Sequence, residues 1–154
     1  AAGDVTMTAT WTEQNLTATK TISVTVPVPT TQYTCKITNT STTNPVVYDD
    51  ITNPLAIKVG STGTSAKPLV SHFYDSIGTE VTTLLPKWSL DLSSLTIEQQ
   101  SEVTLSYKDT YPTRAYLNVA NDNALIGYTF KVTLEATDGT SSPCTVTATI
   151  TGLY

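Results

Sequence analysis

The feature that most constrains this chain is the strict alternation of apolar and polar residues over short runs. The clearest run is YTFKVTLE, residues 128–135, in which aromatic and aliphatic residues occupy every even-numbered position. A β-strand points successive side chains to opposite faces, so this two-residue period is typical of a strand with one face on a core. Threonine supplies 33 of the 154 residues, and its branched side chain favours strands over helix interiors. These observations predict an all-β fold.

A second run of this kind, KPLVSHFY at residues 67–74, leads into a stretch of turn-forming residues, Asp75 to Gly78. A further extended run begins at Val81 and reaches Trp88 and Leu90. We therefore predict a central hairpin in which residues 67–74 and 81–90 are the two strands.

The chain is predicted to divide at Pro27-Val28-Pro29, because proline cannot donate a hydrogen bond to a sheet and stiffens a connection. Residues 1–27 contain two alternating runs around a turn and predict a β-hairpin. A hairpin alone is marginally stable, so we interpret it as the last strands of a preceding domain or as an arm exchanged with another subunit. Residues 28–154 contain about eight short runs separated by turn residues, a pattern typical of a β-sandwich.

Large apolar residues in the inward phase of these runs form the predicted core. Trp88 is the largest of them, and its burial would contribute about 3 kcal/mol or more. The predicted core residues are Phe73, Trp88, Leu117, Phe130, Val132, Leu134, Val146 and Ile150.

Composition and motifs exclude several classes of function. The net charge is -5 with only 8 basic residues, and these do not cluster, so nucleic-acid binding is not expected. No run approaches 18 apolar residues, so no membrane span is expected. His72 is the only histidine, and no nucleophile motif surrounds it, so we interpret it as a surface histidine and expect neither enzymatic activity nor a cofactor.

The order of the motifs IKVGSTGTSAKPLVSHFYDSIGTEV, KWSLD, LNVANDNALIGYTFKVTLEATDG and CTVTATITG resembles the bacterial immunoglobulin-like (Big) domains of phage virion proteins and bacterial surface proteins. The resemblance covers about residues 55–152, and the hairpin in residues 1–27 is similar to the last two strands of another such domain. It implies an immunoglobulin-like β-sandwich in a tandem array.

This resemblance also implies a function. The expected function is a non-enzymatic structural or display module of a phage virion protein, in a tail, neck or head decoration, with weak binding of host-surface carbohydrate as an added role. Its partners would be other copies or neighbouring virion subunits. The alternative is a stalk or adhesion domain of a protein on the bacterial cell surface.

Cys35 and Cys144 both fall in the inward phase of runs near opposite ends of the second unit, and two readings stay open. First and last strands are often neighbours in a sandwich, so a disulfide could form and would stabilise the fold by roughly 4–5 kcal/mol. The other reading is a pair of buried thiols, because cysteine is often buried and a virion protein folds in a reducing cytoplasm. The second reading is slightly favoured.

Tyr48 and Tyr74, with the loop at residues 40–50, are the candidates for surface binding. Aromatic rings stack on the apolar faces of sugars, which would suit carbohydrate. Isolated exposed tyrosines are, however, ordinary on the surface of a sandwich.

Acidic turn residues could offer oxygen ligands to Ca²⁺. They lie at Asp49-Asp50, at Asp75 and at Asn121-Asp122-Asn123. Aspartate and asparagine are also the common residues of turns, where they bond their own backbone, and no calcium-loop spacing is present. We therefore expect no metal site.

Overall fold

In the computed structural model the described residues are 3–11, 16–24 and 32–152, with side chains described for 32–152. The chain forms two compact units, residues 1–30 and residues 31–154. The boundary predicted at Pro27-Val28-Pro29 lies outside the described residues.

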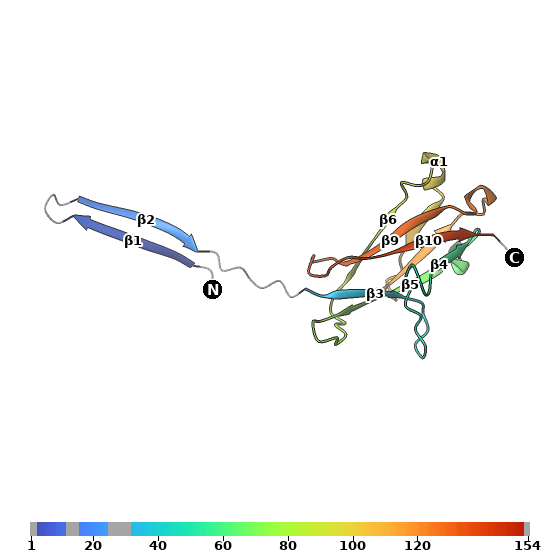
Figure 1. Cartoon of the computed structure of the whole chain (residues 1–154), viewed down its shortest axis with the longest axis horizontal. Coiled ribbons are helices and arrows are strands. Elements are labelled where there is room, and N and C mark those ends of the chain that lie inside the picture. The colour runs from blue at the N-terminus through green and yellow to red at the C-terminus, as the bar shows by residue number, and fades with distance from the viewer. Residues whose placement is uncertain (1–2, 12–15, 25–31, 153–154) are drawn as a thin grey trace. The chain divides into compact units, whose positions relative to one another are not determined.

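The first unit is a β-hairpin. Strands β1 (Gly3–Trp11) and β2 (Leu16–Val24) pair antiparallel, with Gly3 opposite Val24 and Trp11 opposite Leu16 (Figure 1). Among the described residues, each of these strands pairs only with the other. The interpretation of this hairpin as the end of a preceding domain stays a prediction.

The second unit is built from strands, which confirms the predicted all-β class (Figure 1). Its strands are β3 (Thr34–Thr38), β4 (Leu55–Lys58), β5 (Lys67–Tyr74), β6 (Pro86–Asp91), β7 (Val103–Ser106), β8 (Arg114–Val119), β9 (Thr129–Ala136) and β10 (Cys144–Thr151). They form two four-stranded sheets, ordered β3-β5-β8-β7 and β4-β10-β9-β6. All pairings within these sheets are antiparallel except β4 with β10, which is parallel.

Helical structure in the described residues is short. The helix α1 (Ile97–Gln100) begins after Thr96, whose side-chain hydroxyl accepts a hydrogen bond from the Gln99 backbone N–H. Single turns of 3-10 helix lie at η1 (Gly63–Ser65) and η2 (Asn123–Leu125).

The core lies between the two sheets, because every long strand buries alternate residues. In β5, Leu69, Ser71 and Phe73 are buried while the residues between them are partly exposed. The eight core residues named from the sequence all belong to this buried cluster, and none is more than 8% exposed. Trp88 is the most exposed of the eight, and its indole Nε1 is buried without a hydrogen-bond partner among the described residues.

The predicted central hairpin is wrong, because β5 and β6 lie in different sheets. The chain does turn back at Gly78, where φ is +83°, and the Val81 N–H donates to the Phe73 carbonyl (2.8 Å). The antiparallel contact ends there, and β6 begins only at Pro86. Residues 81–85 carry the chain from one sheet to the other, and β6 then pairs with β9.

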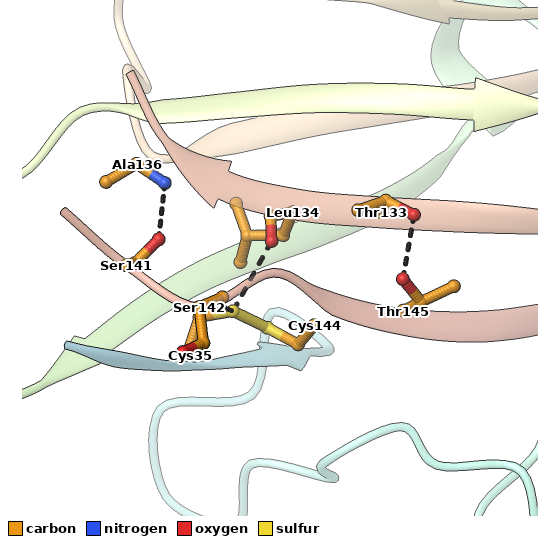
Figure 2. Close-up of a disulfide and its surroundings, with 8 residues drawn as sticks. All are labelled: Cys35, Thr133, Leu134, Ala136, Ser141, Ser142, Cys144 and Thr145. Carbon is orange, nitrogen blue, oxygen red and sulfur yellow. Dashed lines mark hydrogen bonds between the residues drawn. A yellow bond between two sulfur atoms is a disulfide. The ribbon is translucent and has the colours of Figure 1, made fainter. Parts of the chain in front are cut away.

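A disulfide between Cys35 on β3 and Cys144 on β10 joins the two sheets, with the Cα atoms 5.8 Å apart (Figure 2). Of the two readings left open by the sequence, the structure therefore has the disulfide and not the slightly favoured pair of thiols. The physical reason is that the start of β3 runs beside the segment before β10. The Tyr33 N–H donates to the Thr140 carbonyl (3.0 Å), and the Ser142 N–H donates to the Tyr33 carbonyl (2.9 Å).

Two carbonyl oxygens surround the bonded sulfur of Cys35. The Leu134 and Ser142 oxygens lie 3.4 and 3.2 Å from Cys35 Sγ. A disulfide sulfur carries no proton, so these are packing contacts that only a reduced thiol could convert into hydrogen bonds.

The double variant Cys35→Ser with Cys144→Ser is expected to lower the free energy of unfolding by about 4–5 kcal/mol. The reason is that the disulfide closes a loop with a sequence separation of 109 residues, and its loss restores the freedom of that loop in the unfolded chain. Urea unfolding followed by circular dichroism, with and without a reductant, measures the change. Equal midpoints for the wild type in the two conditions would contradict it.

Trp88→Ala is expected to lower the free energy of unfolding by about 3–5 kcal/mol, because the indole fills the interior between the sheets and its removal leaves a cavity. The matched control is Ile51→Ala, since Ile51 is 93% exposed and its loss should change the same quantity by less than about 0.5 kcal/mol. Urea unfolding measures the free energy of unfolding of both variants. Similar losses in the two would contradict the contribution of Trp88 to the core.

Candidate functional site

The candidate site is a groove of about 340 Å³ on the outer face of the β3-β5-β8-β7 sheet. One wall is the loop after β3, the floor is β5, and β8 and the turn after β5 complete the rim. The lining residues are Asn39, Thr40, Ser41, Thr42, Pro45, Val70, His72, Tyr74, Glu80 and Arg114.

Strand alternation and strand register bring the floor of the groove together. Because Leu69, Ser71 and Phe73 face the core, Val70, His72 and Tyr74 point outward. Arg114 lies directly opposite Val70 in the pairing of β5 with β8, although 44 positions separate the two in the chain. The groove therefore combines an aromatic ring, an imidazole and a guanidinium on neighbouring strands.

The side chain of Asn39 makes two of the hydrogen bonds that hold the loop wall. Its Oδ1 accepts hydrogen bonds from the Ser41 N–H (3.2 Å) and the Val46 N–H (3.0 Å). The Asn39 N–H also donates to the Val46 carbonyl (3.1 Å), which closes the loop on itself. Because Oδ1 is engaged by the backbone, only the Nδ2 amide of Asn39 is left to face a ligand.

His72 lies between a carboxylate and a hydroxyl. Its Nδ1 is 2.6 Å from Glu80 Oε1, and its Nε2 is 3.0 Å from Thr38 Oγ1. The order Thr38, His72, Glu80 is that of a hydroxyl, a base and an orienting acid in a hydrolytic triad. Thr38 is, however, only 3% exposed, and its hydroxyl donates to the Asn39 carbonyl (3.0 Å). The hydroxyl is therefore closed off from any substrate in the groove.

Cations lie over tyrosine rings across this sheet and the loops beside it. The Arg114 guanidinium is 4.2 Å from the ring centroid of Tyr111, and the Lys36 ammonium is 4.8 Å from that of Tyr74. Lys108 lies 4.5 Å from the ring of Tyr116 in the same way. Such contacts contribute about 0.5–1 kcal/mol each at exposed sites, and they fix long side chains in one position.

Within residues 32–152, no carboxylate forms an ion pair with Arg114 or Lys36. The ion pairs among residues 32–152 are His72 with Glu80 and Lys87 with Glu135. The groove therefore holds one acidic side chain, Glu80, which is already engaged by His72, beside an unneutralised guanidinium.

Partial burial, and after it the charge of Glu80, raise the pKa of the Tyr74 hydroxyl above 10.0. The hydroxyl is therefore protonated at neutral pH and can donate a hydrogen bond into the groove.

The structure brings together part of the binding surface predicted from the sequence. Tyr74 and residues 40–42 and 45 of the predicted loop all line the groove. Tyr48 does not line it; it packs against the core, with the Lys67 ammonium 5.4 Å from its ring centroid. Both tyrosines are half-buried and not exposed as predicted. Sequence reasoning missed Arg114, because only the register of β8 on β5 reveals its place.

The acidic turn residues are dispersed, and Asp75 and Asp122 each bond their own turn. Asp75 Oδ1 accepts from the Ile77 and Thr79 N–H groups (3.0 and 2.8 Å), and Asp122 Oδ1 accepts from the Ala124 N–H (2.8 Å). Within the described part of the chain, no group of three or more histidine, cysteine, aspartate or glutamate side chains could hold a metal ion.

Asp49 and Asp50, which are adjacent in the chain, also differ in their partners. Asp49 Oδ1 accepts hydrogen bonds from the N–H groups of its own turn, including that of Ile51 (2.8 Å). Asp50 Oδ1 instead accepts from the Thr147 N–H on β10 (2.6 Å). Both carboxylates therefore accept hydrogen bonds from the protein itself, Asp49 within its own turn and Asp50 from β10.

Comparison with known proteins adds no assignment: no family model matches the chain, and no curated protein gives a significant match. Within the described residues, no helix is long and apolar enough to cross a membrane.

Hydrogen bonds from the Thr140 side chain and backbone lower the pKa of Asp138 below 3.8. A carboxylate whose pKa is lower in the folded state stabilises the fold above its unfolded pKa, and this contribution is lost as the pH falls through the folded pKa. We expect the melting temperature to drop below pH 3.8, and to drop less steeply in Asp138→Asn. Thermal unfolding between pH 5 and pH 2 tests this expectation, and parallel curves for the two proteins would contradict it.

Proposed function

We propose that the chain is a non-enzymatic structural and display module of a phage virion protein, in a tail, neck or head decoration. In this proposal the second unit is an immunoglobulin-like domain in a tandem array that carries mechanical load. Weak contact with host-surface carbohydrate is its added role. Other copies or neighbouring virion subunits are its partners.

The order of strands supports the immunoglobulin-like assignment. An immunoglobulin sandwich has strands A-B-E-D in one sheet and C-F-G in the other. Reading β3, β5, β8 and β7 as A, B, E and D, and β6, β9 and β10 as C, F and G, reproduces both orders. β4 is then a continuation of strand A that pairs with the second sheet. Trp88 lies on strand C, where such domains carry their core tryptophan. The difference is the disulfide, which here joins A to G and not B to F.

Likeness between the two hairpins of the chain supports a tandem array. The segment DVTMTAT of β1 aligns with KVTLEAT of β9, so that Val5 corresponds to Val132. In the observed registers Val5 lies opposite Ile22, and Val132 lies opposite Val146. This likeness supports the interpretation of the first hairpin as the F–G hairpin of a preceding domain.

The observation that carries the spacer role in this proposal is the disulfide between the first and last strands of the second unit. Tension applied at the two ends of this unit reaches Cys35 and Cys144 and passes through the covalent bond. The intervening segment, with a sequence separation of 109 residues, carries none of the load and cannot be pulled out. Such an inextensible link suits a spacer in a chain of like domains.

Burial of Thr38 supports the non-enzymatic part of the proposal. Of the three residues aligned as a hydroxyl, a base and an acid, the hydroxyl is inaccessible and already donates to a carbonyl. The contacts of His72 with Thr38 and Glu80 instead hold these side chains in place at the edge of the groove.

A second candidate function is a stalk or adhesion domain on the bacterial cell surface, and the same disulfide favours it. Disulfides form in oxidising environments, whereas virion proteins assemble in a reducing cytoplasm. Mass spectrometry of purified phage particles and of the cell envelope separates the two candidates. Peptides from residues 32–152 in particles support the virion assignment, and peptides in the envelope alone overturn it.

The load-bearing role is tested by pulling the full chain between two handles in a force spectrometer. The oxidised protein should lack a lengthening event that appears once a reductant is added. The expected gain is roughly 360–390 Å, from the sequence separation of 109 residues at about 3.3–3.6 Å each. The same gain in both conditions would contradict the proposal.

A further inference from the structure

We propose that the groove between the loop at residues 39–45 and β5 binds an acidic saccharide, with the carboxylate of a sugar acid held by Arg114. This inference rests on the carbohydrate contact included in the proposed function and names its ligand class and its site.

Charge selects an anionic ligand. The whole chain carries a net charge of -5, yet the groove holds Arg114, which has no carboxylate partner among the described side chains, and Lys36 lies beside Tyr74 at its edge. The acidic group in the groove, Glu80, is engaged at 2.6 Å by His72. A guanidinium offers two parallel N–H donors that match the two oxygens of a carboxylate. The Arg114 guanidinium, which no described carboxylate contacts, is therefore the group in the groove that can receive the carboxylate of a ligand.

The remaining lining suits a sugar. The side chains of Thr40, Ser41 and Thr42 supply hydroxyls that can exchange hydrogen bonds with sugar hydroxyls, and Asn39 adds the Nδ2 amide. Val70 and Pro45 supply apolar surface for the C–H face of a sugar ring. The volume of about 340 Å³ lies within the range of small-ligand sites.

The site is formed before a ligand arrives. The loop wall is closed by the hydrogen bonds to Asn39 Oδ1, and the Arg114 side chain is stacked on Tyr111. Little conformational freedom is then lost on binding, which favours affinity.

An acidic peptide fits the same surface less well. Peptides commonly bind a sheet by adding a strand to a free edge, where the backbone offers unpaired hydrogen-bonding groups. The floor of the groove is β5, which β3 pairs along Val70–Tyr74. On its other side β8 pairs with Lys67–Val70, and beyond them the Ser71 N–H donates to the Thr113 carbonyl and the Phe73 carbonyl accepts from the Val81 N–H. A peptide would therefore find no free backbone edge, whereas a sugar needs only the side chains.

Titration of the isotope-labelled full chain with tetragalacturonic acid, followed by NMR, tests the proposal. We expect shift changes confined to the groove, and at least a tenfold weaker affinity for the methyl-esterified tetrasaccharide, which lacks the charge. Arg114→Gln should weaken binding at least tenfold, and Arg114→Lys should fall between it and the wild type because it lacks the planar fork.

The matched control is Lys87→Gln, which removes one positive charge from β6 in the other sheet and should leave binding unchanged. Equal losses of affinity in the Lys87 and Arg114 variants would show that binding depends on net charge and not on this groove, and would overturn the site. Equal affinity for the ester would overturn the role of the carboxylate. Absence of binding by the tetrasaccharide would overturn the whole inference.

Two further titrations test whether the groove prefers an anion other than a sugar acid. Tighter binding of a glycerol phosphate polymer through Arg114 would assign the site to phosphate and overturn the sugar acid. Tighter binding of polyglutamate would overturn the saccharide class. The force measurement contains no ligand, so the spacer role can stand when saccharide binding fails, and the reverse also holds.

Discussion

Burial of one face of each four-stranded sheet against the other is the constraint on which the second unit depends. Once Leu69, Phe73 and their equivalents on the other strands face inward, the residues between them must point away from the core toward the outer face of each sheet. The two outer faces then differ in chemistry. On the β4-β10-β9-β6 sheet threonines pair across strands, as in the hydrogen bond of Thr133 with Thr145 (2.9 Å; Figure 2), whereas the other sheet carries His72, Tyr74 and Arg114.

The sequence predicts strands well where alternation is regular and pairing poorly where it is not local. The run at residues 128–135 indicates β9 because its apolar residues all fall in one phase, although Tyr128 lies just before the strand. The same reasoning fails for β5 and β6. A strand that faces the core has the same period whichever sheet it belongs to, so periodicity does not identify its partner. The sequence signal against a hairpin of β5 and β6 is the irregular stretch at residues 81–85, followed by Pro86.

The candidate site also contains residues that the sequence predicts and residues that depend on non-local strand pairing. Tyr74 and the loop at residues 40–50 are near in sequence to the strands that hold them, and their outward phase or turn character could be read directly. Arg114 could not be found in this way, since its place opposite Val70 depends on the pairing of β5 with β8. The cysteines are a similar case. Alternation places both cysteines in the inward phase. Whether they form a disulfide depends on the approach of β3 to β10 across the two sheets, which alternation does not reveal.

In the proposed spacer role, β3 would connect the path of the applied force to the groove. Cys35 lies opposite Phe73 in the pairing of β3 with β5, and the next residue, Lys36, lies opposite His72. Alternation therefore directs the cysteine toward the interior and the lysine toward the outer face. In a chain under tension, force entering before β3 leaves through the disulfide at Cys35. The hydrogen bonds that hold the groove, beyond that residue on β3, β5 and β8, carry no load, so a ligand site there would keep its geometry while the module is pulled.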